Sequence, residues 1–236
     1  MPLLSSLPLP TQALFDQFAQ LLITASQEMN LTAVTDLEGI RVRHFEDSLA
    51  ALPTLEAFRA EQKLNTVRLL DIGSGAGFPG LALALAAPWL RVTSLEATGK
   101  KVRFQQSIID ALGLTNATVL QDRAEDLGHD APHRDRYDIV TARAFAPLPI
   151  LAELTLPFVH PGGLLLAWKG ARLPEELAEA KLILSILGAG APQEIAYTLP
   201  GIAEAESHFR IVVFPKKKRT PPTYPRPMSK IKKSVK

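Results

Sequence analysis

Glycines recur every two or three residues directly after a short apolar run, at Gly73, Gly75, Gly77 and Gly80. The run, residues 67–72, predicts a buried strand, and the Pro79 that follows the turn can begin a helix. Backbone in such a strand–turn–helix can approach a ligand closely, and the helix N-terminus favours negative charge. The stretch therefore predicts a cofactor site; the alternative is a glycine turn without a ligand, although several glycines in one turn cost stability.

Two classes of cofactor use this geometry. The last three glycines match the dinucleotide fingerprint Gly-x-Gly-x-x-Gly, so an NAD-dependent oxidoreductase is one candidate. Asp71 favours S-adenosyl-L-methionine instead, because a carboxylate there can face the ammonium of the methionine moiety but repels a pyrophosphate. The string Asp-x-Gly-x-Gly-x-Gly also resembles the first motif of Rossmann-like methyltransferases. Glu96 lies 23 residues past Gly73, near where a Rossmann acid meets the ribose hydroxyls.

Alternating strand and helix patterns surround the turn. Strands are predicted at residues 67–72, 91–95, 117–121, 137–141 and 164–168, with an antiparallel pair at 193–199 and 209–214. Helices are predicted at 81–87, 100–112, 147–159 and 174–187. This order predicts an α/β, Rossmann-like fold with a mostly parallel seven-stranded sheet, whose ligand lies at the carboxyl ends of the strands.

An all-helical extension, residues 1–66, precedes the sheet region, residues 67–214. Apolar residues at helical spacing predict a first helix over 11–29. The capping-box spacing of Thr35 and Glu38 predicts a second helix through about Leu52. Residues 53–66 are charged and loosely patterned, and they are expected to link the extension to the sheet.

Charged residues of the extension and of the strand ends are the candidates for chemistry. The second predicted helix brings together four neighbours, Arg43, His44, Asp47 and Ser48, which form either a surface ion pair plus a hydrogen-bonded histidine or part of a site. His44 can be neutral or charged near pH 7. Arg143 and Lys169 end the fourth and fifth predicted strands, on the same rim as the glycine turn. Glu125 follows the third strand and either borders an adenine or belongs to a helix cap.

The position after the fourth strand bears on the methyl acceptor. Methyltransferases that act on amino groups usually carry an Asn/Asp-Pro-Pro-aromatic box there, whereas residues 141–144 read Thr-Ala-Arg-Ala. The acceptor is therefore expected to need no base, which suits a ring nitrogen with a free lone pair, such as guanine N7. Catalysis then reduces to holding this nitrogen in line with the methyl group.

Composition limits the classes of function. The 236-residue chain is 47% hydrophobic and has no cysteine, which excludes a disulfide scaffold, thiolate zinc sites and a cysteine nucleophile and suits a reducing cytoplasm. The two histidines and two aspartates of residues 128–136 fit no compact metal site, so no metal is expected. Neither a signal peptide nor a membrane-spanning segment is predicted.

Positive charge is concentrated at one end of the chain. Residues 215–236 hold nine of the 26 Lys and Arg and none of the 24 Asp and Glu, which leaves residues 1–214 at −7. The basic segment also contains several prolines, so it is expected to be extended or disordered. It predicts contacts with the phosphates of a polyanion; the alternative is a solubilising tail.

Several strings, taken together and in order, carry a resemblance over nearly the whole chain. They are Asn30-Leu-Thr-Ala33, Arg43-His-Phe-Glu-Asp-Ser48, the glycine turn to Gly80, Asp122-Arg-Ala-Glu125, Thr141-Ala-Arg-Ala144, Trp168-Lys-Gly170 and the Pro-Lys-Lys-Lys and Thr-Tyr-Pro-Arg tail. In combination they resemble the bacterial ribosomal RNA small-subunit methyltransferase G family, also called glucose-inhibited division protein B. The tail departs from the family in reading Arg-Pro-Met-Ser-Lys where a Pro-Gly-Thr-Pro-like run is frequent.

The resemblance implies S-adenosyl-L-methionine-dependent N7 methylation of a guanine in 16S ribosomal RNA of the small subunit, with S-adenosyl-L-homocysteine as product. It implies cofactor contacts at Gly73, Phe78, Ala124, Glu125 and Arg143, to which Glu96, Ala97 and Thr98 are added. It places further residues in the cleft between the extension and the sheet: Asn30, His44, Asp47, Arg143 and Lys169. Arg143→Ala is expected to abolish methyl transfer and leave the fold intact.

The expected partner is 16S ribosomal RNA or the small subunit, met by a cytoplasmic monomer without an obligate protein partner or a membrane. Three alternatives stay open at this point. They are a methyltransferase for a small molecule, the NAD-dependent oxidoreductase, and an RNA-binding or cofactor-sensing protein that has the fold but no activity.

Overall fold

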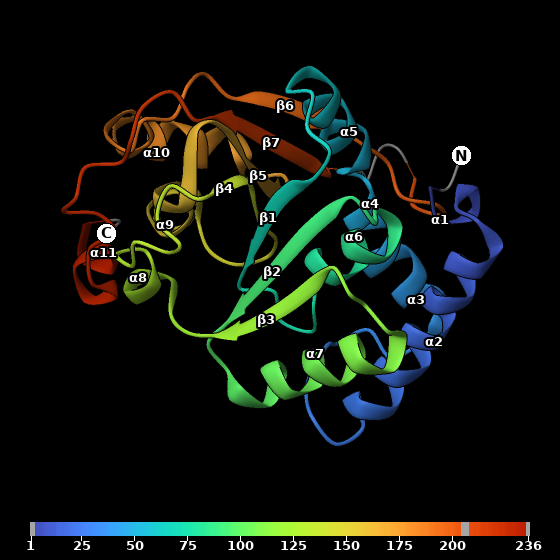
Figure 1. Ribbon diagram of the computed structural model, residues 1–236. Helices are drawn as coiled ribbons and strands as arrows, with labels where there is room; N and C mark the ends of the chain where they lie inside the picture. Colours follow the sequence, from blue (N-terminus) through green and yellow to red (C-terminus); the bar gives the residue numbers. More distant parts are fainter. Residues whose placement is uncertain (1–2, 204–207, 235–236) are drawn as a thin grey trace.

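A seven-stranded sheet forms the centre of the computed structural model, which describes residues 3–203 and 208–234 (Figure 1). Its strands are β1 (Val67–Ile72), β2 (Leu90–Glu96), β3 (Ala117–Gln121), β4 (Tyr137–Ala142), β5 (Val159–Lys169), β6 (Gln193–Ala196) and β7 (Arg210–Pro215). They run in the order β3-β2-β1-β4-β5-β7-β6; the first five are parallel, and β7 is antiparallel to both neighbours. The predicted Rossmann-like α/β fold is confirmed.

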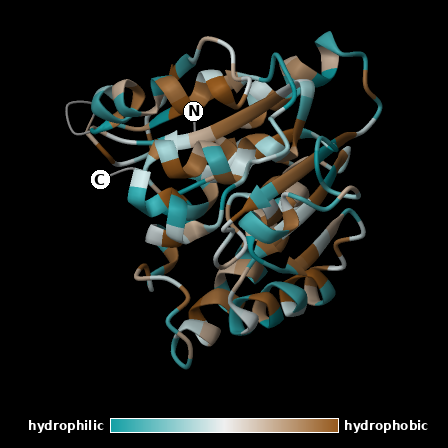
Figure 2. Cartoon of the chain, turned by 90° about the vertical axis from the view of Figure 1, so that its left-hand side faces the viewer, coloured by the Kyte–Doolittle hydropathy of each residue, from teal (hydrophilic) through white to brown (hydrophobic). Residues whose placement is uncertain are grey.

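Helices cover the two faces of the sheet. One face packs with α2 (Leu9–Ser26), α6 (Gly80–Ala86) and α7 (Gly99–Leu112), and the other with α8 (Ala124–Leu127), α9 (Leu148–Thr155) and α10 (Leu173–Ile186). Leu69 of β1 belongs to the first core and Leu70 to the second, because successive strand residues point to opposite faces. Figure 2 shows the resulting brown, apolar strands between helices.

The helical extension differs from the prediction in two respects. The helix predicted from residue 35 is capped by Asp36, whose Oδ1 accepts the Gly39 N–H at 2.7 Å. It comprises α3 (Leu37–Ile40), a wider π-helical turn (Arg41–Glu46) and α4 (Asp47–Leu49). The predicted linker contains α5 (Leu52–Glu61), which starts with a proline in its first turn and buries Leu52, Leu55 and Phe58.

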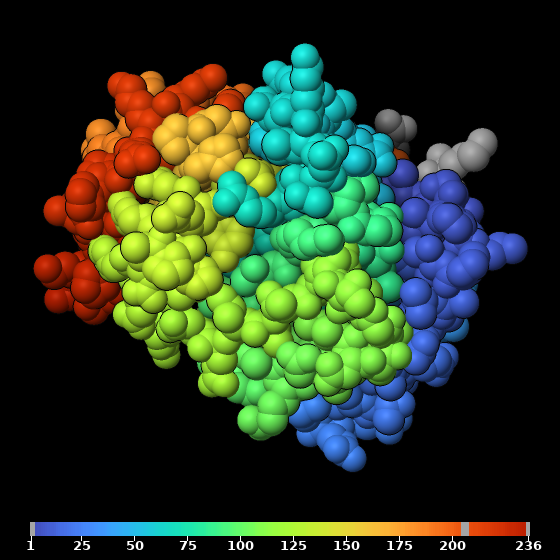
Figure 3. All heavy atoms as spheres, viewed as in Figure 1, coloured from blue at the N-terminus to red at the C-terminus, as the bar shows by residue number. Residues whose placement is uncertain are grey.

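The C-terminal segment is packed, so its prediction as an extended or disordered tail is wrong for the described residues. Lys216 is 1% exposed, and its Nζ donates to the carbonyls of Leu156 and Leu187 at 2.9 and 2.6 Å. Burial lowers the pKa of Lys216 to about 7. Further on, α11 (Met228–Ser234) buries Ile231, and Figure 3 shows this red segment against the yellow-green chain before β4. Within residues 3–203 and 208–234, no helix has the length and apolar character needed to cross a membrane.

Candidate active site

Asp71, on β1, holds the glycine turn between β1 and α6 from inside the protein. One carboxylate oxygen accepts the Gly80 N–H at 2.8 Å and the other accepts the Thr141 hydroxyl at 2.9 Å. Burial raises the pKa of Asp71 to about 6, although both hydrogen bonds oppose this shift. The side chain has no exposed surface. Asp71 therefore fixes the turn from inside the protein, and the expectation that it faces the methionine ammonium is not supported.

Glu96 connects the end of β2 with the same turn. Its two carboxylate oxygens accept the N–H groups of Gly75 at 3.0 Å and Thr98 at 2.8 Å. Gly75 has a φ of +60°, and a Cβ built on it would meet nothing within 4 Å, so the backbone is open to a ligand there. Ala97 and Thr98 are exposed beside it. Open backbone and an exposed turn thus lie beside Glu96, and its contact with a ribose stays a prediction.

Phe78 joins the turn to the helical extension. Its ring stacks on Phe18 at 5.1 Å and on His44 at 4.8 Å between centroids, and it is 5% exposed. The Arg143 guanidinium lies 5.4 Å from the ring centroid. The side chain predicted to contact the cofactor is thus enclosed by protein, and it positions His44 and Arg143 against the turn.

Arg143 ties the end of β4 to the π-helical turn. Its Nη1 lies 2.6 Å from Asp47 Oδ2 and also donates to the Arg43 carbonyl at 3.2 Å. The other Asp47 oxygen accepts the Tyr197 hydroxyl, and the Asp47 carbonyl accepts the Trp168 indole N–H at 2.9 Å. Burial and the adjacent Asp47 carboxylate raise the pKa of Tyr197. Arg143 and Asp47, both predicted to line the cleft, are therefore joined in a largely buried network.

His44 is part of this network as a neutral ring. Its Nε2 lies 2.7 Å from the Thr32 hydroxyl, and its Nδ1 lies 3.5 Å from Arg143 Nη2. Burial, followed by the charge of Arg143, lowers the pKa of His44 to about 4. Of the two protonation states left open by the sequence, the neutral one holds near pH 7.

A cavity of about 510 Å³ lies beside Arg143, at the carboxyl ends of β4 and β5. Aromatic rings and charged groups share its lining, which includes Phe145, Trp168, Lys169, Glu176, Tyr197 and Phe209. Lys169 Nζ contacts Glu176 Oε2 at 2.6 Å and the Ala146 carbonyl at 2.8 Å. Arg143 and Lys169 share one cavity, as their positions at neighbouring strand ends predict.

The remaining predicted residues are distributed around this centre. The ring of Phe145 covers Gly73, since a Cβ there would lie 2.2 Å from Phe145 Cδ2. Gly77 and Ala124 are buried, and the side chain of Glu125 is 10% exposed. Asn30 is exposed just before the buried Leu31. No hydrogen bond to the Asn30 side chain is present among the described residues, so its predicted role in the cleft stays a prediction.

Four residues that complete the network were not identified from the sequence: Thr32, Trp168, Glu176 and Tyr197. Trp168 directly precedes Lys169, so strand alternation alone could have placed it near the rim. Tyr197 follows β6, 150 residues after its partner Asp47. No local pattern links residues at that separation.

Comparison with known proteins gives a consistent answer. The family model described as rRNA small subunit methyltransferase G matches residues 11–195. The protein of this name from Lactococcus lactis subsp. cremoris (strain MG1363) is 42% identical over 212 residues, which cover 90% of this chain and 85% of the relative. That from Streptococcus pneumoniae (strain ATCC BAA-255 / R6) is 40% identical over 223 residues, which cover 94% and 90%.

Solved structures support the fold. An O-methyltransferase from Bacillus cereus in complex with SAH superposes with a TM-score of 0.57 at 14% identity, covering 85% of this chain and 91% of the other. An rRNA methylase from Streptococcus thermophilus gives a TM-score of 0.50 at 17% identity, with 71% and 96% covered. The family match settles the choice between the cofactor classes against the NAD-dependent oxidoreductase, and the chain belongs to the rRNA small subunit methyltransferase G family.

Proposed function

We propose that the protein transfers a methyl group from S-adenosyl-L-methionine to N7 of a guanine in 16S ribosomal RNA of the small subunit. It is proposed to act in the cytoplasm as a monomer that meets the RNA directly. The observation that carries the proposal is the absence of an available general base among the described residues around the cavity.

Among the described residues, each carboxylate that lines the cavity is paired with a cation. Asp47 accepts from Arg143 and Tyr197, and Glu176 accepts from Lys169 and from the Leu148 N–H at 2.7 Å. His44, with a pKa lowered to about 4, is a weak base whose nitrogens face Thr32 and Arg143. A methyl acceptor that must lose a proton would find only weak bases among these described groups. Guanine N7 carries a free lone pair and has no proton to lose.

The glycine turn and the exposed turn after β2 are the proposed binding site of S-adenosyl-L-methionine. The backbone at Gly75 is open, the adjacent turn at Ala97 and Thr98 is exposed, and each Glu96 oxygen accepts only one N–H, which leaves lone pairs for ribose hydroxyls. When bound, this molecule supplies an electrophilic methyl group on a sulfonium. Arg143 lies between this turn and the cavity, where its cation–π contact and ion pair hold it in one orientation.

The reaction balances without proton transfer. The N7 lone pair forms the new bond to the methyl carbon while the carbon–sulfur bond breaks, and its electron pair stays on sulfur to give the thioether S-adenosyl-L-homocysteine. The positive charge passes from sulfur to the base. Phe145, Trp168 and Phe209 provide aromatic surface beside the cavity, which suits a base taken out of its stack. The chain's contribution is alignment of the two reactants.

The proposal is tested by incubating the protein with labelled S-adenosyl-L-methionine and small ribosomal subunits from cells that lack this enzyme. Label is expected in 16S RNA, at one guanine that becomes sensitive to borohydride and aniline, the chemistry diagnostic of an N7-methylated ring. Label on an exocyclic amine or a carbon, located by mass mapping, would refute the N7 assignment. Absence of transfer to RNA would favour the small-molecule or the non-catalytic alternative.

A further inference from the structure

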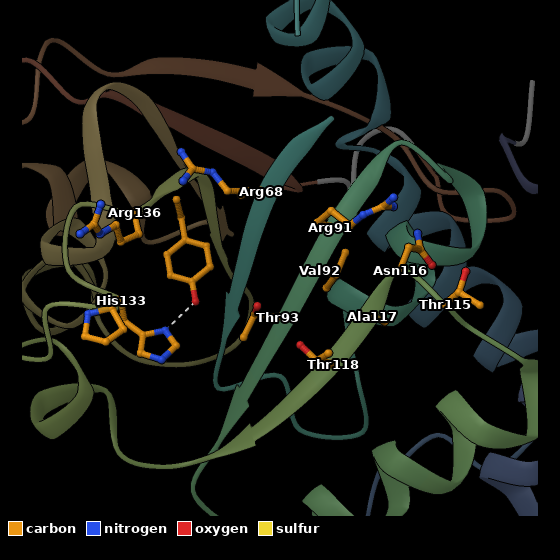
Figure 4. A pocket seen from close by; sticks show the side chains of 12 residues that line it. Arg68, Arg91, Val92, Thr93, Thr115, Asn116, Ala117, Thr118, His133 and Arg136 are labelled. Carbon is orange, nitrogen blue, oxygen red and sulfur yellow. Dashed lines mark hydrogen bonds between the residues drawn. The ribbon is translucent and has the colours of Figure 1, made fainter. Parts of the chain in front are cut away.

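A second cavity, of about 310 Å³, lies at the amino ends of β1, β2 and β3, at the opposite end of the sheet from Gly73 (Figure 4). Its lining has three arginines and no Asp or Glu: Arg68 on β1, Arg91 on β2 and Arg136 directly before β4. Figure 4 shows Arg136 and Arg91 on opposite sides of the cavity, with Arg68 between them. Nothing in the methyl-transfer chemistry uses these residues.

The cavity exists because one face of the sheet is left uncovered there. Parallel strands are normally covered by the helix that connects them, but the connection from β3 to β4 contains only the four-residue α8, which packs on α9. Arg91, Thr93 and Thr118 therefore point away from the buried core on this face, with Thr93 next to Thr118 in register. Val92 and Ala117, which point to the other face, are buried. The uncovered positions are polar, which suits a face in contact with water or a polar ligand.

This face is positively charged, whereas residues 1–214 as a whole carry a net negative charge. Residues 1–214 carry 17 Lys and Arg against 24 Asp and Glu, so an acid-free group of three arginines contrasts with its background. Arg68 is paired with Asp138 at 3.1 Å. Arg91 and Arg136 are exposed, and each donates to backbone carbonyls; neither has an ion-pair partner within residues 3–203 and 208–234. Two guanidinium charges are therefore available for an anion.

We infer that this uncovered sheet face, with Arg91 and Arg136, binds the phosphate backbone of the ribosomal RNA substrate at a point remote from the methylated guanine. The inference rests on the proposed function. β4 and β2 are two inter-strand spacings apart, about 10 Å, so cations on either side of β1 can contact two different phosphates of one chain. On β3, next to β2, the exposed hydroxyl of Thr118 supplies a neutral donor at the Arg91 side of the cavity.

The position of this face has a consequence for the substrate. The six residues of β1 separate it from the glycine turn by roughly 20 Å. A short single strand that places its guanine in the active site would have to extend along the whole sheet to reach Arg91. A folded RNA of subunit size can contact both ends at once. The contribution of the face should therefore grow with the size of the RNA.

Steady-state kinetics on small ribosomal subunits at several salt concentrations test the inference. For Arg91→Ala/Arg136→Ala we expect KM for subunits to rise roughly tenfold, kcat and cofactor affinity to stay as in the original protein, and the salt slope of binding to fall by about two. Arg91→Lys/Arg136→Lys should restore most of the affinity, because phosphate contacts tolerate either cation. Lys181→Ala removes an exposed charge from α10, outside the cavity, and should change nothing.

Unchanged KM and salt slope in the alanine pair, with the original protein active, would overturn the inference while leaving the proposed function intact. Filter binding of the same variants to purified 16S RNA gives a readout that does not depend on methyl transfer. If the original protein binds this RNA but transfers no methyl group, the proposed function fails, and the binding difference between the variants still decides the inference. Circular dichroism establishes that each variant is folded.

Discussion

The cationic side chains at the two ends of the parallel sheet differ in burial and in their partners. At the carboxyl end, the side chains of Arg143 and Lys169 are 12% and 7% exposed, and each lies 2.6 Å from a carboxylate. At the amino end, Arg91 and Arg136 are exposed, and within the described part of the chain they bind backbone carbonyls but no carboxylate. The first arrangement fixes geometry at the proposed reaction centre, and the second leaves charge available to a large anion.

The physical difference between the two ends lies in desolvation. Removing one partner of a buried ion pair leaves an uncompensated charge and costs about 3–5 kcal/mol, whereas an exposed pair contributes about 0–1 kcal/mol. Variants at the carboxyl end should therefore lose stability and activity together. Variants at the amino end should lose only affinity for RNA, in a manner that depends on salt.

The largest effect is expected from Arg143→Ala. Loss of the guanidinium removes the group that aligns the rim and leaves Asp47 with a half-satisfied, 13% exposed carboxylate. Methyl transfer should fall at least about a hundredfold. The free energy of unfolding should fall by about 3 kcal/mol. Initial rates and urea unfolding measure the two quantities.

A second variant separates alignment from stability. Arg143→Ala/Asp47→Ala removes both charges, so it should recover part of the lost unfolding free energy while activity stays low. Full activity in Arg143→Ala would show that the guanidinium has no part in the reaction. Equal recovery of both properties in the double variant would show that the pair is only structural.

Arg226→Ala tests whether burial of the remaining carboxylate is enough to explain the loss of unfolding free energy. The Arg226 guanidinium pairs at 2.7 Å with Glu153, which is 1% exposed and lies on α9, and the same Glu153 accepts the Arg226 N–H. Leaving Glu153 unpaired should lower the unfolding free energy by about 3 kcal/mol, with kcat and cofactor affinity unchanged. Urea unfolding and calorimetric titration of S-adenosyl-L-methionine measure these effects.

The matched control for this pair is Arg226→Ala/Glu153→Leu, which removes the stranded carboxylate and should regain most of the stability. If Arg226→Ala instead lowers kcat as strongly as Arg143→Ala, burial does not distinguish the pairs, and the C-terminal segment contributes to the reaction itself.

The fold was predictable because its signals are local. Each central strand is a short apolar run, and Gly113 ends α7 in the left-handed conformation that its position predicts. The position of Arg143 and Lys169 was also predictable, because the carboxyl ends of neighbouring parallel strands lie at the same edge of the sheet.

Other features depend on contacts that no local pattern contains. Asp71 is buried inside the turn, where one of its carboxylate oxygens accepts the hydroxyl of Thr141 on the adjacent strand β4. The C-terminal segment has the composition of a disordered chain, yet the carbonyls of Leu156 and Leu187 bind its Lys216. Tyr197 reaches Asp47 only through the β6–β7 pairing. Charge and spacing do not encode such long-range partners.

The smallest net effect expected is a pH dependence of stability, because His44 and Asp71 contribute to it with opposite signs. Its pKa is about 4 in the folded protein against 6.5 for the free side chain, so the unfolded state takes up the proton first as the pH falls. Stability contributed by the neutral ring is complete above pH 6.5 and is lost toward pH 4, by at most about 3 kcal/mol. Asp71, with a pKa raised to about 6, has the opposite dependence, since the folded state keeps its proton between pH 6 and 4.

Comparison with His44→Phe separates the two contributions, because this variant keeps a ring against Phe78 and keeps Asp71. Urea unfolding from pH 7 to 4.5 should show a smaller loss of stability on acidification in His44→Phe than in the original protein. If the free energy of unfolding changed with pH in parallel for the two proteins, His44 would be solvated. The site around Arg143 would then not differ in desolvation from the exposed arginines at the other end of the sheet.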